Sequence, residues 1–175
     1  MDDTAPPTDD VPWLDPDERR TWLALLQLTT LLPGSVEAQL GRDADLTFFE
    51  YSVLAVLSER PDGTARMSQL AMLANGSLSR LSHVARRLEA KGFIRREPLP
   101  DDGRITVAVL LDPGRRAVVA AAPGHVRHVR SVLFTTLSRA EVVELGRLAV
   151  KAVQAIDSPV SAAMRAAMRA VLEDR

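Results

Sequence analysis

Hydrophobic and polar residues alternate along most of the chain with the three- and four-residue spacing of amphipathic helices. The first apolar stripe consists of Trp22, Leu25, Leu26, Thr29 and Leu32. It follows Asp15-Pro16, a pair typical of a helix start, whereas residues 1–15 lack periodicity and predict a flexible acidic arm. Pro33-Gly34 predicts a kink or a break in this helix, which then resumes through Val36 and Leu40.

End signals mark the next two helices. Thr47, with Glu50 three residues later, forms a capping-box pattern that opens a helix reaching about Glu59. Ser68 is expected to cap a short helix that ends near Leu73.

A turn at Asn75-Gly76 precedes a longer predicted helix over residues 77–90, which ends at Gly92. Residues 93–97 and the β-branched run 105–111 are then separated by turn residues, which predicts a β-hairpin with a charged tip.

The remaining chain is rich in Ala and Val and predicts further helices, with interruptions at Pro123-Gly124 and Ser158-Pro159. Ser138 and Glu141 form another capping box. The final apolar stripe, within residues 160–172, is expected to dock on a dimer, with a partner-binding helix as the alternative.

Two helices joined by a short turn that contains glycine, followed directly by a basic hairpin, describe a winged helix-turn-helix. On the helix over 77–90, the residues expected to face the core are Leu78, Leu81, Val84, Ala85 and Leu88. The opposite face carries Ser79, His83, Arg86 and Arg87, with Arg80 at its edge. Arginine can bind guanine edges in a bidentate manner, so this face is a candidate for DNA recognition.

The charge distribution supports this interpretation although the net charge is only −1. Residues 1–18 contain seven acids and no base, while residues 66–130 contain twelve bases and five acids. The chain therefore has an acidic N-terminal arm and a basic middle. The arm either stays clear of DNA or competes with phosphate for the basic face.

Other classes of protein are disfavoured. The absence of cysteine excludes disulfides and thiol chemistry, and only three histidines are present. No cofactor and no enzymatic activity are expected, because no nucleophile–base pair, carboxylate pair or phosphate loop can be assembled from the spacing. No apolar run reaches the length of a membrane span, so a soluble cytoplasmic protein, associated with the nucleoid through DNA, is expected.

The hairpin tip contains Asp102-Gly103-Arg104. A single arginine at a tight turn suits the narrow, electronegative minor groove. The carboxylate of Asp102 is expected to hold the Arg104 guanidinium in position.

The run from Ser79 to Arg96, which includes Leu88-Glu89-Ala90-Lys91-Gly92, together with Asp102-Gly103-Arg104, resembles the MarR family of bacterial transcription regulators. The resemblance implies a mainly α fold with a small β-hairpin wing, a winged helix-turn-helix flanked by N- and C-terminal dimerisation helices. It also implies a homodimer on a pseudo-palindromic operator, with repression relieved by a small aromatic or anionic ligand.

In these terms the chain divides into an arm (1–15), an N-terminal dimerisation helix and loop (16–46), a DNA-binding lobe (47–112) and C-terminal dimerisation helices (113–175). The resemblance places Ser77, Ser79, Arg80, His83, Arg86, Asp102 and Arg104 at positions that contact DNA or support a contact.

Two residues depart from the family pattern. Ile105 stands where a small polar residue is common, and Leu111 stands where threonine commonly precedes the next helix, although Asp112 can replace it as a cap.

Several alternatives stay open. The protein could be an adaptor that binds protein or ligand without reading DNA. Trp22, Phe48, Phe49 and Tyr51 are either core residues or part of an effector pocket. His125 and His128 either lie on a polar helix face or contribute to a zinc site. Arg95 and Arg96 contact the DNA backbone or are plain surface charge.

Overall fold

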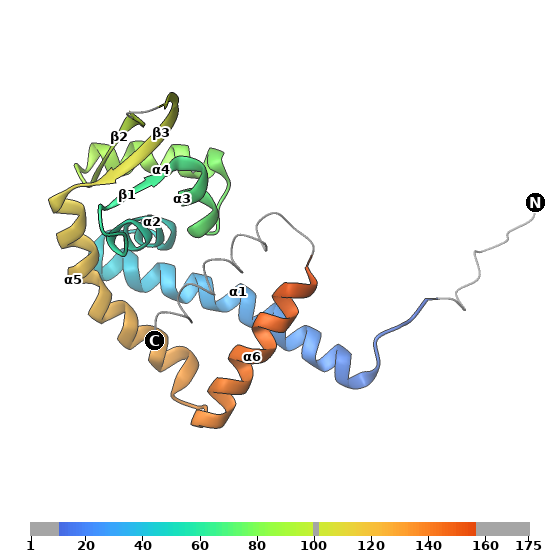
Figure 1. Cartoon of the computed structure of the whole chain (residues 1–175). Helices are drawn as coiled ribbons and strands as arrows, with labels where there is room; N and C mark the ends of the chain where they lie inside the picture. The colour runs from blue at the N-terminus through green and yellow to red at the C-terminus, as the bar shows by residue number, and fades with distance from the viewer. Residues whose placement is uncertain (1–10, 100–101, 157–175) are drawn as a thin grey trace, which may run out of the picture. The chain divides into compact units, whose positions relative to one another are not determined.

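A computed structural model of the chain describes residues 11–99 and 102–156 (Figure 1). The chain divides after Ser35 into two compact units. Helix α1 (Pro16–Ala44) crosses this division, and all later elements belong to the second unit.

Helix α1 begins where the sequence predicts. The side-chain Oδ1 of Asp15 accepts the backbone N–H of Glu18 at 2.9 Å, so Asp15 caps the helix. A break at Pro33 is wrong, because the helix continues through this residue. A proline inside a helix frees one backbone carbonyl, here that of Thr29, and Thr29 is exposed so that water can hydrate this group.

Helix α2 (Phe48–Ser58) starts with the predicted capping box. The Thr47 hydroxyl accepts the backbone N–H of Glu50 at 3.1 Å, and Oε2 of Glu50 accepts the backbone N–H of Thr47 at 2.9 Å. These two bonds satisfy donors that the first helical turn leaves without partners.

Helix α3 (Met67–Leu73) follows strand β1 (Thr64–Arg66) without a loop. The N-cap is Arg66, with no side-chain capping bond, so the expectation that Ser68 caps this helix is wrong. The pairing of β1 within the sheet fixes where the helix starts, and Ser68 falls inside its first turn.

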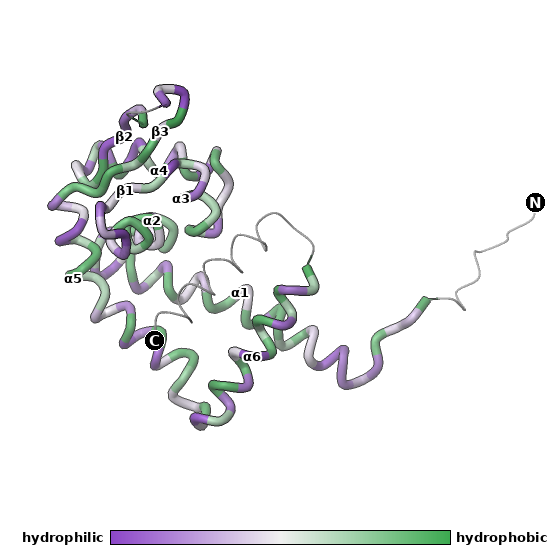
Figure 2. Tube along the Cα trace, in the orientation of Figure 1, coloured by the Kyte–Doolittle hydropathy of each residue, from purple (hydrophilic) through white to green (hydrophobic). Residues whose placement is uncertain are grey.

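The predicted hairpin consists of β2 (Ile94–Leu99) and β3 (Asp102–Leu110). Strand β1 adds a third strand on the other side of β3, giving the antiparallel order β1-β3-β2, with Thr64 opposite Val109. Strand β1 was not predicted from the sequence, because three residues are too few to show an alternating pattern. Figure 2 shows that the free end of the β2–β3 hairpin is hydrophilic.

Helix α4 (Leu78–Ala90) carries the predicted end signals. The Ser77 hydroxyl accepts the backbone N–H of Arg80 at 3.1 Å. The C-cap is Lys91, and Gly92 follows with a φ of +67°, the left-handed conformation that ends many helices.

The chain continues through α5 (Asp112–Val129), the π-helix η2 (Arg130–Phe134) and α6 (Arg139–Ala155). The predicted interruption at Pro123 is wrong, because α5 runs through it. The carbonyl that this proline leaves without a donor belongs to Val119, which is 63% exposed and open to water.

The remaining end signals differ in outcome. The capping box of Ser138 and Glu141 is present at the start of α6. The N-cap of α5 is Leu111 without a side-chain bond, so Asp112 does not replace the missing cap and instead lies in the first turn. The Ser158-Pro159 signal and the final apolar stripe lie outside the described residues.

The core of the second unit joins α2, α3, α4 and the sheet. Its largest fully buried side chains are those of Leu40, Leu46, Leu54, Leu57, Leu70, Leu81, Leu88, Ile94 and Val53. Since α4 and the sheet share this core, the hairpin cannot shift relative to α4 without disturbing buried contacts.

A polar contact also ties α4 to the hairpin. Oε1 of Glu89 accepts the backbone N–H of Arg96 at 2.9 Å, and its Oε2 accepts Nε and Nη2 of Arg96 at 3.0 and 2.6 Å. These hydrogen bonds from Arg96 hold the pKa of Glu89 below its usual range.

We expect Glu89→Gln to destabilise the protein by about 1 kcal/mol at neutral pH. Because the pKa of Glu89 is lower in the folded chain, the contact stabilises the fold above the ordinary value of 4.5 and loses this effect as the pH falls through the folded value. Chemical denaturation of the wild type and of Glu89→Gln at several pH values measures the free energy of unfolding of each protein. The difference between the two free energies should become smaller in acid. Glu144→Gln, in an exposed pair on α6, is the control, and a difference that stays constant with pH would contradict the assignment.

Candidate nucleic-acid interface

Helix α4 buries one apolar stripe, composed of Leu81, Val84, Ala85 and Leu88. Leu78 does not belong to it: this side chain is 52% exposed, so the prediction that Leu78 faces the core is wrong. Leu78 occupies the first position of α4, at the edge of the stripe, and lines an open groove between α4 and the wing. The buried stripe fixes which residues of α4 face outward.

Ser79, His83 and Arg86 lie on the side of α4 opposite the buried stripe, and all three are exposed. Nη2 of Arg86 donates to Nδ1 of His83 at 2.7 Å. A histidine that accepts at Nδ1 carries its proton on Nε2, which leaves the ring one N–H donor for an external acceptor. The outward centre of α4 is therefore a set of hydrogen-bond donors.

Arg80 lies on the flank of α4 next to α2. Its guanidinium carbon stands 4.3 Å from the ring centroid of Phe49, a cation–π contact. Phe49 is buried in the core, and its ring lies so close to Gly76 that a Cβ atom there would come within 2.4 Å. Ser77, another residue predicted to lie at the interface, is the N-cap of α4.

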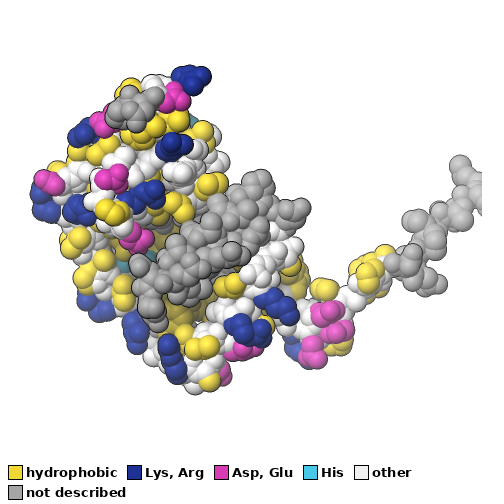
Figure 3. All heavy atoms as spheres, in the orientation of Figure 1, with side chains coloured by type: hydrophobic (Ala, Val, Ile, Leu, Met, Phe, Trp, Pro, Cys, Tyr) yellow, Lys and Arg dark blue, Asp and Glu magenta, His cyan; other side chains and the backbone are white. Residues whose placement is uncertain are grey.

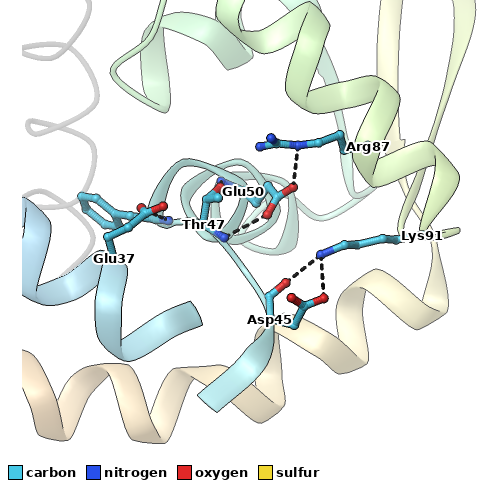
Figure 4. Close-up of polar contacts among 7 residues, drawn as sticks. Glu37, Asp45, Thr47, Glu50, Arg87 and Lys91 are labelled. Atoms are coloured by element: carbon cyan, nitrogen blue, oxygen red, sulfur yellow. Dashed lines mark hydrogen bonds and ion pairs between the residues drawn. The ribbon is translucent and has the colours of Figure 1, made fainter. Parts of the chain in front are cut away.

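Arg87 and Lys91 bind acidic groups of the neighbouring segments, as Figure 4 shows. Nε of Arg87 donates to Oε1 of Glu50 at 3.1 Å. Nζ of Lys91 donates to the backbone carbonyl of Asp45 at 2.6 Å and to its carboxylate at 3.2 Å. Sequence reasoning did not find these partners, since Glu50 lies 37 residues before Arg87.

The wing contains the ion pair that the sequence predicts. Nε of Arg104 donates to Oδ1 of Asp102 at 3.0 Å, and the Arg104 side chain is 92% exposed. Hydrogen bonds from the side chain and backbone of Arg104 lower the pKa of Asp102. The carboxylate thus stays ionised and holds a guanidinium at the end of the hairpin. Figure 3 shows Lys and Arg side chains at this end and along the lobe below it.

A groove of about 390 Å³ separates α4 from the wing. Its polar lining residues are Ser68, Ser82, Arg96, Arg104 and Thr106. The apolar lining residues are Met67, Leu78 and Ile105.

Ser68, Ser82 and Thr106 are not among the site residues predicted from the sequence. The position of Ser82 on the wing-side flank of α4 is a signal that could have identified it. Among the described residues the groove is lined by two arginines and by neutral side chains, and each arginine also pairs with a carboxylate outside the lining, Arg96 with Glu89 and Arg104 with Asp102.

The four aromatic residues considered for an effector pocket separate in the structure. Phe49 points into the core beneath Arg80, whereas Phe48 and Tyr51 lie beside His125, with ring centroids 6.3 and 4.6 Å from the imidazole. Trp22 lies in the N-terminal unit and is 53% exposed.

Burial raises the pKa of Tyr51 and lowers the pKa of His125, and Nδ1 of His125 is buried without a hydrogen-bond partner. Within residues 11–99 and 102–156, no three His, Cys, Asp or Glu side chains gather as a metal site would require. In the same part of the chain, no helix is long and apolar enough to cross a membrane.

Comparisons with known proteins agree with this architecture. The MarR family model matches residues 46–106. A MarR family transcriptional regulator from Streptomyces coelicolor, crystallised in complex with DNA, is 35% identical and superposes with a TM-score of 0.81, over 87% of this chain and 95% of the regulator.

A second Streptomyces coelicolor regulator of the family, AbsC, is 34% identical, with a TM-score of 0.74 over 79% of this chain and 93% of its own. BpsR of Bordetella bronchiseptica, whose DNA binding is regulated by 6-hydroxynicotinic acid, shares the fold at 19% identity, with a TM-score of 0.69 over 84% of this chain and all of its own. No curated protein matches the chain. With a regulator 35% identical over nearly its whole length, this chain belongs to the MarR family of transcription regulators.

Proposed function

We propose that this regulator binds double-stranded DNA with the outward face of α4 in the major groove and Arg104 in the minor groove. The observation that carries the proposal is that one rigid lobe presents both the exposed donors of α4 and the exposed arginine of the wing. An α-helix fits the major groove, and the narrow minor groove attracts arginine.

The electrostatics of the lobe favour the same partner. Covering Ser79, His83 and Arg86 with an apolar protein surface would leave the Arg86 guanidinium and the neutral donors beside it without acceptors, at a high cost in free energy. A DNA duplex supplies base edges and phosphates as acceptors. The Streptomyces regulator crystallised with DNA supports this assignment by its similarity to this chain.

The working protein in this proposal is a homodimer. Helix α1 exposes a series of large apolar side chains, those of Trp22, Leu23, Leu25, Leu26, Leu28 and Leu31. Leu31 is 70% exposed, and α6 also exposes Val143 and Leu148. Apolar surfaces of this extent on a helix are typical of subunit contacts, and a two-fold dimer matches a pseudo-palindromic operator.

Repression and its relief by a small molecule are part of the same proposal. The ring cluster of Phe48, Tyr51 and His125 supplies an aromatic wall and an imidazole nitrogen without a partner. Such a combination suits a small aromatic or anionic effector.

We expect Arg104→Ala to weaken binding by about tenfold or more on a duplex recovered by selecting bound fragments from the source genome. The loss follows from the missing minor-groove cation, and fluorescence anisotropy would measure it. Arg147→Ala, on α6, is the control and should bind like the wild type. Wild-type protein that recovers no duplex above the non-specific level would contradict the proposal and favour an adaptor that does not read DNA.

We expect light scattering to give twice the chain mass of 19.1 kDa for the wild type. Leu31→Glu places a charge on the exposed apolar series of α1, so this variant should dissociate into monomers at micromolar concentration. Arg42→Ala, in the last turn of α1, should leave the mass unchanged. A wild-type mass of 19.1 kDa would refute the dimer.

A further inference from the structure

Glu50 is an unusual residue in the lobe, because its charged side chain is only 3% exposed. Gln39 is the other buried polar side chain in the described part of the chain. Removing a carboxylate from water is costly unless hydrogen bonds and an opposite charge compensate it. The partners of the two Glu50 carboxylate oxygens therefore show how this buried charge is stabilised.

Each oxygen of Glu50 has a separate partner. Oε2 accepts the backbone N–H of Thr47 at 2.9 Å and completes the capping box at the N-terminus of α2, where the helix dipole favours a negative charge. Oε1 accepts Nε of Arg87 at 3.1 Å. The carboxylate is thus fixed on α2 and holds an arginine of α4.

The bond to Glu50 uses the nitrogen of Arg87 that is nearest to its aliphatic stem. Figure 4 shows the terminal nitrogens extending past Glu50, and the Arg87 side chain remains 58% exposed. A guanidinium carries five N–H donors, so four stay on the two terminal nitrogens for another acceptor. A side chain held in this way gives up little rotamer freedom when it binds.

Arg80 repeats the arrangement two turns earlier on the same flank of α4. It rests on Phe49, the residue directly before Glu50 in α2. Seven residues along a helix correspond to about 10.5 Å, so α2 supports two arginines at separate points along one flank. The groove with Arg96 and Arg104 lies on the wing side of α4, and Ser79, His83 and Arg86 lie between the two sides.

When a helix lies in the major groove, its centre faces base edges and its flanks face the two phosphate backbones. We propose that Glu50 is a positioning residue that presents Arg87 to a DNA phosphate, and that Arg87 contributes affinity without reading sequence. The proposal rests on the DNA binding proposed above. It places Phe49 in the same supporting role for Arg80.

The test is a double-mutant cycle of Glu50→Gln and Arg87→Ala in the full chain. Glutamine at this position still completes a capping box, so Glu50→Gln removes the charge while keeping the helix start. The probes are a mixed-sequence duplex of about 30 base pairs, long enough for two half-sites one turn apart, and the duplex recovered by genomic selection. Glu144→Gln and Arg147→Ala, which remove an exposed pair on α6, form the matched control cycle.

We expect Arg87→Ala to weaken binding by about tenfold, by the same factor on both duplexes. The slope of log affinity against log salt should become shallower by about two for a dimer, which is about one for each Arg87. Glu50→Gln should weaken binding about three- to tenfold when Arg87 is present and should have no effect in the Arg87→Ala background. A loss that depends on Arg87 indicates that Glu50 acts by positioning this arginine. A general effect of Glu50→Gln on stability would weaken binding both in the wild type and in Arg87→Ala.

Three results would overturn the inference: equal losses from Glu50→Gln in both backgrounds, tighter binding by Glu50→Gln, or a loss from Arg87→Ala that differs between the two duplexes. If Glu50→Gln does not fold, the salt slope and the duplex comparison for Arg87→Ala still decide whether Arg87 contacts phosphate. A wild type that binds neither duplex would refute the proposed function, whereas a binding wild type with an additive cycle refutes the positioning role alone.

Discussion

The burial of one stripe of α4 is the interaction on which the rest of the lobe depends. Leu81, Val84, Ala85 and Leu88 pack into the core shared by α2, α3 and the sheet. Because a helix has a fixed period, burying these four residues determines that Ser79, His83 and Arg86 face outward. Exposed polar groups on the opposite face are therefore a direct consequence of the hydrophobic packing.

Polar contacts then fix what packing alone leaves adjustable. Glu50, Asp45 and Glu89 bind Arg87, Lys91 and Arg96, and each pair joins α4, or the residue that ends it, to a different neighbour. An exposed ion pair contributes little stability, but a set of directional bonds restricts the sliding and rotation of a helix. In the proposed function, this restriction is what keeps the donors of α4 and Arg104 in one arrangement.

Helix ends and ion pairs were predicted correctly from the sequence where they depend on contacts between residues close together in the chain. The capping boxes of Thr47 and Ser138, the end of α4 at Gly92 and the Asp102–Arg104 pair all involve residues at most three positions apart or a single turn. The stripe of α4 was predicted from its period, except for Leu78 at the end of the helix, where period alone does not determine burial.

The misses have non-local causes. Strand β1 exists because β3 pairs with it, and the start of α3 follows from that strand. The helices continue through Pro33 and Pro123, since the carbonyls that these residues leave without donors belong to exposed positions. Glu50 and Arg87 come into contact only when α2 and α4 pack together. This contact cannot be predicted from a short stretch of sequence, because the two residues are 37 positions apart.

In the proposed function, the basic surface of α4 and the wing binds DNA through several phosphate contacts. The most direct measurement is the affinity of the wild-type chain for its selected duplex over a series of KCl concentrations. Since each phosphate contact releases a counterion, log affinity should fall linearly with log salt, with a slope of about −4 or steeper for a dimer. An affinity that does not change with salt would contradict DNA binding through phosphate contacts.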